Sequence, residues 1–267
     1  MDGVRAPCTL LRFSVIHLTR AVSGSYFLLR ESMLDSVLKA RDKWMKPGGS
    51  MYPSHARILM APMRGHTGRK KQDDLADAVE GWSEFCEVTG AKFGVDMGAL
   101  STAFKAEQTQ YYLQTSLWSD ISPSQLLGPP VVLASYDLNA ITVEDITRPT
   151  CSFEMVLEGV GSGVGVDALC GWFDVDFRGS GANPASSPVT LDTAPDEQGA
   201  THWGQQVFYL HPPQPAEADD VLAGSLELVR KTENHRLLTV HMQLRHGRRV
   251  GGELQLGPAR MEHFSIE

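Results

Sequence analysis

Glu31 is the first residue whose type and position could do chemistry. It lies in the run Arg30-Glu31-Ser32-Met33, in the first turn of an expected helix. An acidic residue there interacts favourably with the helix dipole, which by itself accounts for the glutamate. The same carboxylate could instead face a cleft and bind a guanidinium group, because the two groups form paired charge-assisted hydrogen bonds. The residues alone leave both interpretations open.

Thr201, His202 and Trp203 form the second stretch of interest. They follow a polar, turn-prone run and precede the apolar segment 205–210. The threonine could end a loop, the histidine could bond to a turn, and the tryptophan could fill the mouth of a barrel. Alternatively, the three residues form one edge of an active site, since histidine is the commonest acid–base group.

The glycine-rich run ending in Gly163-x-Gly165-x-x-Ala168 fits a loose dinucleotide-binding pattern. A phosphate-binding loop must open a helix, whereas the residues that follow are typical of a strand, so we predict a hairpin loop. The nine histidines show no metal-ligand spacing, and we expect no metal site. The cysteines form no paired motif, which favours a reducing compartment, cytoplasmic or nuclear: Cys8, Cys86, Cys151 and Cys170.

The overall charge bears on the class of partner. The chain of 267 residues is 42% hydrophobic, enough for one large domain or two small ones, and its formal net charge is −8. Such acidity argues against nucleic acid as a partner and suits basic substrates. No apolar run approaches the roughly 18 residues that span a bilayer, so we expect no membrane partner.

Two helical regions and a series of strands must position these residues. Leu29, Met33, Val37 and Leu38 form one apolar stripe on a helix within 26–47, which Pro47-Gly48-Gly49 stops. A strand is expected within 50–63. Two aromatic-rich helices are expected within 69–119, running as far as Trp118, and their aromatic surface must be buried in a core or against a partner.

The rest of the chain is typical of short antiparallel strands. We predict strands over 130–137, 151–158, 168–178, 188–193, 203–210, 221–230, 236–246 and 250–257. The expected fold is mainly β: an antiparallel β-barrel-like domain with an inserted two-helix arm and a leading N-terminal helix.

Taken in order, these motifs resemble the protein arginine N-methyltransferase family, most closely its plant and algal branch. The resemblance rests on YFLLRESMLDSVLKARDKWMKPGGSMYPSHARILMAP, GVDMGAL, GWFDVDF and THWGQQVFYL, and it runs from Tyr26 to the C-terminus. It implies that Glu31 is the second glutamate of a pair that binds the substrate guanidinium, and that His202 is a catalytic residue at the barrel side of the cleft. It also implies four substrate-binding residues: Tyr26, Met33, Thr201 and Trp203.

The resemblance further implies a domain map and partners. Residues 1–25 would be unrelated or poorly ordered, 26–47 a bridging helix, 48–68 the first barrel strand region, 69–119 a dimerisation arm and 120–267 the remaining β-barrel domain. The methyl donor would be S-adenosylmethionine, and the substrates Gly/Arg-rich proteins. The arm would form a homodimer or a heterodimer.

The sequence also departs from the family pattern. The first glutamate of the pair would fall at Val22, and we find no glycine-rich strand–loop–helix for the methyl donor. We therefore expect a truncated form that lacks the Rossmann-like methyl-donor domain and is inactive alone. The alternative is a regulatory partner that dimerises with an intact methyltransferase. Without that domain the helix stripe would lose part of its cover, and we expect poor solubility or self-association.

Overall fold

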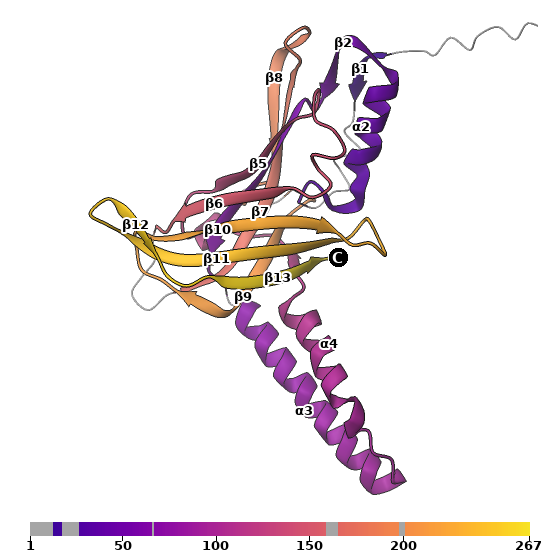
Figure 1. Cartoon of the computed structure of the whole chain (residues 1–267), viewed down its shortest axis with the longest axis vertical. Helices are drawn as coiled ribbons and strands as arrows, with labels where there is room; N and C mark the ends of the chain where they lie inside the picture. Colours follow the sequence, from indigo (N-terminus) through magenta and orange to yellow (C-terminus); the bar gives the residue numbers. More distant parts are fainter. Residues whose placement is uncertain (1–12, 18–26, 66, 159–164, 198–200) are drawn as a thin grey trace, which may run out of the picture.

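The fold contains two large antiparallel sheets, a small parallel sheet with a leading helix, and a projecting pair of helices. The computed structural model describes residues 13–17, 27–65, 67–158, 165–197 and 201–267 (Figure 1). The six-stranded sheet has the order β4 (Leu117–Ser119), β9 (Gln205–Pro215), β7 (Gly165–Gly179), β3 (His55–Met63), β5 (Val131–Asp137), with β8 (Pro184–Asp192) beside β7. The five-stranded sheet has the order β12 (Glu253–Leu256), β11 (Leu238–Val250), β10 (Asp220–Arg230), β6 (Thr150–Val156), with β13 (Arg260–Ile266) beside β11.

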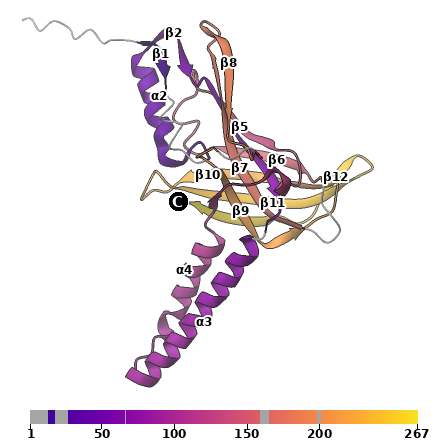
Figure 2. The ribbon, with the colours of Figure 1, turned by 180° about the vertical axis from the view of Figure 1, so that it is seen from behind.

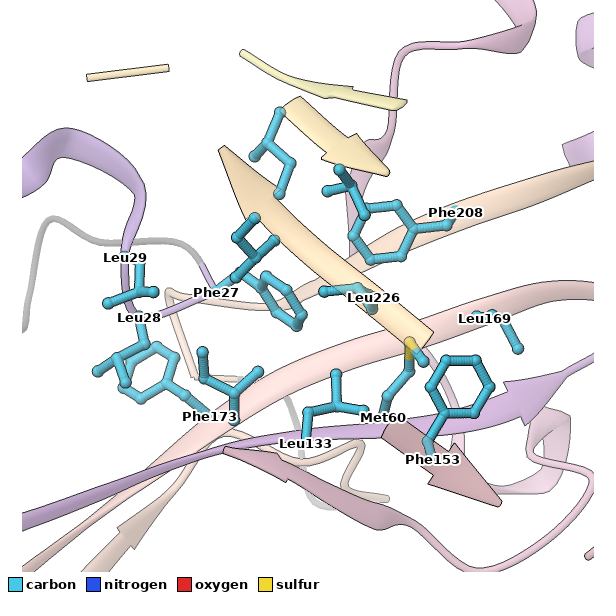
Figure 3. Close-up of a cluster of buried hydrophobic side chains, with 14 of the residues drawn as sticks. Phe27, Leu28, Leu29, Met60, Leu133, Phe153, Leu169, Phe173, Phe208 and Leu226 are labelled. Carbon is cyan, nitrogen blue, oxygen red and sulfur yellow. The ribbon is translucent and has the colours of Figure 1, made fainter. Parts of the chain in front are cut away.

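The mainly β, antiparallel fold class is as expected, but the barrel is not closed. Within the described ranges no strand of one sheet pairs with a strand of the other. They instead share an apolar core, to which Phe173 and Phe208 of one sheet and Phe264 of the other contribute (Figure 3). Burial between two sheets satisfies the apolar strand faces without a continuous ring of hydrogen bonds.

Strand β7 has apolar residues on both faces because it separates two clusters. Leu169, Phe173 and Val175 point into the core between the sheets. Cys170 and Trp172 point the other way, into a second cluster under the base of the helical arm. Since side chains alternate along a strand, one continuous apolar run serves both clusters.

The leading helix is shorter than predicted. Residues Arg30–Ser32 form a 3-10 turn (η1), and helix α2 spans Met33–Trp44. Met45–Tyr52 is strand β2, which pairs in parallel with β1 (Phe13–His17). Its residues 45–47 lay in the expected helix, and 50–52 lay in the expected strand. Sequence periodicity could not indicate this, because the pairing partner lies about thirty residues away. Strand β13 was also not predicted.

The expectation of an uncovered helix stripe is wrong at three of its four positions, while Met33 is half-buried. Leu29, Val37 and Leu38 are at most 5% exposed and belong to the main core cluster. The chain's own segment after β5 helps to cover the helix, since Leu138 lies in that cluster and its carbonyl accepts a hydrogen bond from Arg41 Nη1 at 2.8 Å.

The helical arm extends away from both sheets (Figures 1 and 2). Helix α3 spans Thr67–Phe93, a 3-10 turn η2 spans Gly98–Leu100, and helix α4 spans Ser101–Leu113. Trp82 holds the two helices together: its ring stacks on Phe104 at 4.4 Å between centroids, and its Nε1 donates to Ser101 Oγ at 2.8 Å. None of the described helices is both long and apolar enough to cross a membrane.

Helix α4 ends earlier than predicted, so Trp118 belongs to strand β4. The aromatic residues of the arm are not all buried within the chain. Trp82 is used inside the arm, whereas other large apolar side chains are about half exposed or more: Phe85 48%, Val88 59%, Phe93 67%, Leu100 53% and Tyr111 65%.

A half-buried histidine at the arm base predicts a pH dependence of the fold's stability. Gln72 Nε2 lies 2.9 Å from His211 Nδ1. Burial, together with the positive charges of Lys71 and Arg260, lowers the pKa of His211 to about 4 from its ordinary 6.5. The folded state therefore takes up this proton later than the unfolded state as the pH falls. The stability associated with neutral His211 is complete above pH 6.5 and is lost between pH 6.5 and 4.

We expect His211→Gln to flatten the fall of Tm between pH 6.5 and 4 relative to the unmodified chain. Glutamine keeps a polar partner for Gln72 but carries no titrating proton. Thermal unfolding followed by circular dichroism across this pH range measures the effect, with the exposed His235→Gln as the matched control. Parallel pH curves for the unmodified chain and His211→Gln would contradict the assignment.

Candidate functional site

Glu31 lies in a backbone segment with an unusual conformation. Four non-glycine residues of this segment have positive φ angles: Phe27 at 52°, Leu28 at 62°, Glu31 at 72° and Ser32 at 54°. Side chains other than glycine rarely adopt this region, and each instance costs on the order of 1 kcal/mol. The buried side chains of Phe27, Leu28 and Leu29 hold the segment in place (Figure 3). As a result, Glu31 is not the ordinary first-turn glutamate of a regular helix.

The Glu31 carboxylate is enclosed and contacts two guanidinium groups. Its side chain is 14% exposed, and Arg30 Nη1 lies 3.2 Å from its Oε1. Arg236 donates from Nε and pairs through Nη2 to the other carboxylate oxygen, Oε2. The backbone N–H of Glu31 also donates to the Arg236 carbonyl at 2.8 Å, and Ser32 Oγ donates to the His235 carbonyl. The loop between β10 and β11 therefore covers the carboxylate.

The Thr201-His202-Trp203 turn packs against the same core cluster through Trp203. Gly204 N–H donates to the Thr201 carbonyl at 3.0 Å and closes the turn. The His202 and Trp203 rings lie 3.9 Å apart between centroids, tilted by 32°. Trp203 also meets the buried ring of Phe173 edge to face, with centroids 5.9 Å apart. His202 is exposed and Thr201 and Trp203 are half-buried.

The core connects these two regions without a direct contact between the chemical groups. Leu28, Leu29 and Phe173 belong to one cluster, on which Trp203 packs. No hydrogen bond or ion pair links Glu31 to His202 among the described contacts. Met33 is the half-buried first residue of α2. Tyr26 and Val22 lie outside the described residues.

Sequence reasoning missed two contacts of these predicted site residues. Arg236 is 205 positions from Glu31, and nothing in the sequence of its loop indicates the pairing. Trp118 donates its Nε1–H to the Trp203 carbonyl at 2.5 Å. The sequence placed Trp118 at the end of the second arm helix, and it did not indicate the contact with the distant turn.

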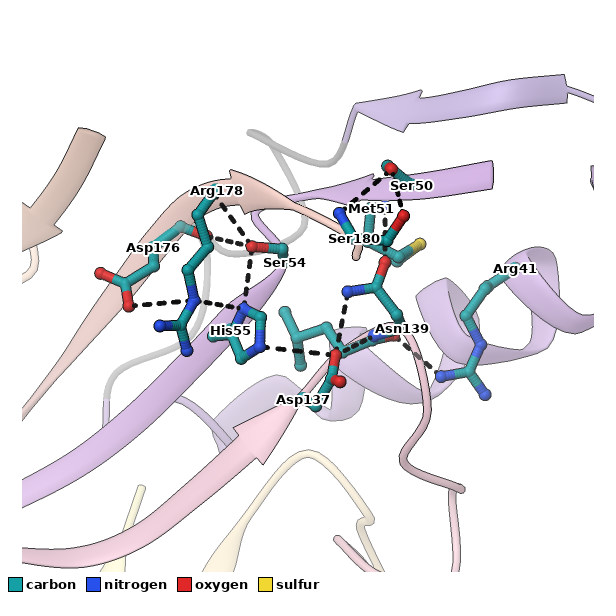
Figure 4. A network of polar contacts seen from close by, with 11 residues as sticks. Arg41, Ser50, Met51, Ser54, His55, Asp137, Asn139, Asp176, Arg178 and Ser180 are labelled. Carbon is teal, nitrogen blue, oxygen red and sulfur yellow. Dashed lines mark hydrogen bonds and ion pairs between the residues drawn. The ribbon is translucent and has the colours of Figure 1, made fainter. Parts of the chain in front are cut away.

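A polar network near β2 has the composition of a hydrolase triad but not its chemistry (Figure 4). His55 Nδ1 lies 2.9 Å from Ser54 Oγ and also accepts from Arg178 Nε at 2.9 Å. Burial and the positive charge of Arg178 lower the pKa of His55. Ser54 is fully buried and its hydroxyl donates to the Asp176 carbonyl at 2.9 Å. The network therefore joins strand ends and does not activate a nucleophile.

A cavity of about 690 Å³ lies elsewhere, beside residues of β9, β10 and β11. The charged side chains that line it already pair with one another: the Asp220 carboxylate lies 2.7 Å from His246 Nε2 and accepts a hydrogen bond from Arg248 Nε at 2.7 Å. Although burial alone raises the pKa of Asp220, hydrogen bonds from Glu217 N–H, His246 and Arg248 bring it below the ordinary value. Among the described residues, no group of three or more His, Cys, Asp or Glu side chains is placed to hold a metal ion.

Comparisons with known proteins agree on one family. Residues 70–249 match the family model described as the arginine methyltransferase oligomerization subdomain. Protein arginine N-methyltransferase PRMT10 of Oryza sativa subsp. japonica is 46% identical over 213 residues, which cover 80% of this chain and 56% of the rice protein. PRMT10 of Arabidopsis thaliana is 42% identical over 222 residues, covering 81% of this chain and 56% of that protein.

The fold also matches a solved structure of a relative. The crystal structure of Arabidopsis thaliana protein arginine methyltransferase 10, described as uniquely open in conformation, superposes with a TM-score of 0.90 at 36% identity. The match covers 99% of this chain and 73% of that one. The chain spans about half the length of the curated relatives that it matches.

Proposed function

This chain belongs to the protein arginine methyltransferase family, and from that premise we propose that it supplies the guanidinium-binding side of a protein arginine N-methyltransferase site. One observation carries the proposal: the enclosed Glu31 carboxylate already binds the guanidinium group of Arg236. Arg236 stands in for the arginine of a protein substrate, which would take its place on the same oxygens. Carboxylate and guanidinium match in charge and in planar geometry.

In this proposal Glu31 and the Thr201-His202-Trp203 turn have different roles. Glu31 binds the substrate guanidinium and fixes its orientation through charge-assisted hydrogen bonds. Trp203 offers an aromatic face, and the exposed His202 offers an imidazole that lies against it. Holding the acceptor in one orientation is the chief contribution that such residues make to a group-transfer reaction.

The family implies S-adenosylmethionine as the methyl donor. A donor of this kind fits a glycine-rich loop that leads from a parallel strand to a helix N-terminus. Among the described residues α2 follows the Glu31 turn, and α3 follows the antiparallel strand β3. The described residues therefore do not fit the donor.

Direct peptide binding tests the proposed function. The purified chain is titrated with a fluorescent Gly/Arg-rich peptide and with the same peptide carrying lysine in place of every arginine. We expect tighter binding of the arginine peptide, since lysine cannot form the paired hydrogen bonds. Labelled S-adenosylmethionine in a parallel assay reports methyl transfer. Equal affinity for the two peptides, with no transfer to either, would contradict the proposal.

A non-catalytic role is the second candidate, and a specific observation favours it. Arg30 and Arg236 already engage both oxygens of Glu31, so the site is satisfied within the chain. In that case the chain acts as a partner that dimerises with an intact methyltransferase and alters its rate. Co-purification with such a relative, together with failure to bind the arginine peptide, would separate this function from the first.

We propose that the arm forms the dimer contact in either case, whether with a second copy or with a relative. The match to an oligomerization subdomain begins at residue 70, within α3, and supports this role. The exposed apolar side chains defined above, among them Val88 and Phe93, supply the surface.

We expect Phe93→Asp to weaken self-association at least about tenfold, because an unpaired carboxylate would be buried at the contact. Sedimentation equilibrium measures the change. Val189→Asp is the matched control, since Val189 is 60% exposed on β8, away from the arm. If both variants associate like the unmodified chain, the arm is not the interface.

A further inference from the structure

Trp118 makes an unusual use of its indole. It lies on β4, the short strand that follows the arm, and 43% of its surface is exposed. Its Nε1–H nevertheless donates to a single backbone acceptor, the Trp203 carbonyl, at 2.5 Å. The acceptor is in the middle of the Thr201–Gly204 turn. An exposed tryptophan therefore fixes the peptide plane between Trp203 and Gly204.

Gly204 shows how close the indole and the turn are. A Cβ atom at position 204 would lie 2.8 Å from both Cε2 and Nε1 of Trp118. The φ angle of Gly204 is +50°, a region that glycine enters readily. Position 204 therefore favours glycine for two reasons: the indole of Trp118 leaves no room for a Cβ atom, and the backbone has a positive φ angle.

The segment that carries Trp118 is itself tied to the sheets. Ser116 N–H and Oγ both donate to the Ser265 carbonyl, at 2.9 and 2.8 Å, and Ser265 N–H donates to the Gln114 carbonyl at 2.7 Å. Gln206 Nε2, just after the turn, donates to Ser116 Oγ at 2.6 Å. Trp118 itself pairs with Gln206 in the β4–β9 ladder. The turn and the root of the arm are therefore held as one unit.

We propose that Trp118 is a positioning residue that sets the orientation of the His202 and Trp203 side chains. The indole holds the Trp203 carbonyl in place through its hydrogen bond. The position of this carbonyl then determines the orientation in which the Trp203 ring contacts His202 and Phe173. This inference rests on the proposed function only for its effect on substrate. The conformational part concerns the chain alone.

Trp118→Phe tests the inference because phenylalanine keeps an aromatic ring but has no N–H donor. The chain contains five tryptophans, so the variant leaves four indole N–H signals in a ¹H–¹⁵N spectrum: Trp44, Trp82, Trp172 and Trp203. We expect the Trp203 signal to shift while those of Trp44 and Trp82, elsewhere in the fold, stay in place. The affinity for the arginine peptide should fall about three- to tenfold, in line with the loss of one hydrogen bond.

Gly204→Ala provides the second variant. Added to the unmodified chain, Gly204→Ala should shift the Trp203 indole signal. Added to Trp118→Phe, it should cause a smaller shift, because the smaller phenylalanine ring leaves room for the new methyl group. If Trp118→Phe disturbs all four indole signals, Trp118→Tyr replaces it under the same criterion.

The outcomes separate this inference from the proposed function. If the unmodified chain does not bind the peptide but Trp118→Phe shifts only the signals near the turn, the function fails and the positioning role stands. If the peptide binds and Trp118→Phe changes neither the Trp203 signal nor the affinity, the positioning role is wrong. Restoration of both readouts by Trp118→His, which returns a ring N–H, supports it further.

Discussion

Glu31→Gln should reduce affinity for an arginine peptide by about 30-fold or more. Glutamine has the same shape but no charge, so the guanidinium loses a charge-assisted hydrogen-bond partner worth about 2 kcal/mol or more. The loss should be large because Glu31 is only 14% exposed, and water cannot replace the lost charge. Fluorescence anisotropy with the labelled Gly/Arg-rich peptide measures the effect directly.

Glu227→Gln is the matched control for that experiment. Glu227 also pairs with an arginine, Arg148, whose side chain is 65% exposed on the surface. Exposed pairs contribute little, so this variant should bind the peptide within about twofold of the unmodified chain. If Glu31→Gln binds as tightly as Glu227→Gln, the carboxylate is not the arginine site.

Gly171→Ala should destabilise the fold by about 2–3 kcal/mol, because the added methyl group collides with Phe27. The new Cβ would lie 2.4 Å from Phe27 Cε2 and 3.1 Å from two other ring atoms. The ring is 3% exposed and packs edge to face on Phe208 at 5.7 Å, so it has no free space to enter. A Tm decrease of roughly 5–10 °C is expected for a chain of this size.

The same substitution should also weaken peptide binding, since Phe27 begins the segment that carries Glu31. Gly181→Ala is the control, because nothing lies within 4 Å of its Cβ and its φ angle is not positive. Differential scanning calorimetry of both variants, followed by peptide titration, gives the two readouts. Equal Tm values for Gly171→Ala and Gly181→Ala would show that Phe27 can move at little cost.

Elements with strong local patterns could be predicted, and elements that depend on distant partners could not. The two arm helices and most strands of the sheets follow from periodicity and turn residues. The start of strand β2, residues 45–47, was mistaken for the end of a helix because its conformation depends on pairing with β1. The separation into two sheets likewise depends on which strand faces which, and alternation along one strand does not specify that.

In the candidate site, too, the residue types could be predicted from the sequence, whereas their contacts could not. Glu31 and the Thr201–Trp203 turn could be singled out because their residue types carry chemistry. The positive φ of Glu31, its pairing with Arg236 and the bond from Trp118 to Trp203 could not. Each depends on contacts between residues 85 or more positions apart, or on a strained backbone that only the surrounding core maintains.

The arm has a consequence for how the chain moves through solution. Helix α3 has 27 residues, which corresponds to about 40 Å of length. A compact chain of 267 residues has a radius of gyration of only about 18 Å. A single copy must therefore experience more frictional drag than a sphere of equal mass. On a gel-filtration column calibrated with compact standards, the monomer should elute ahead of its true mass of 29.2 kDa, toward the position of a dimer.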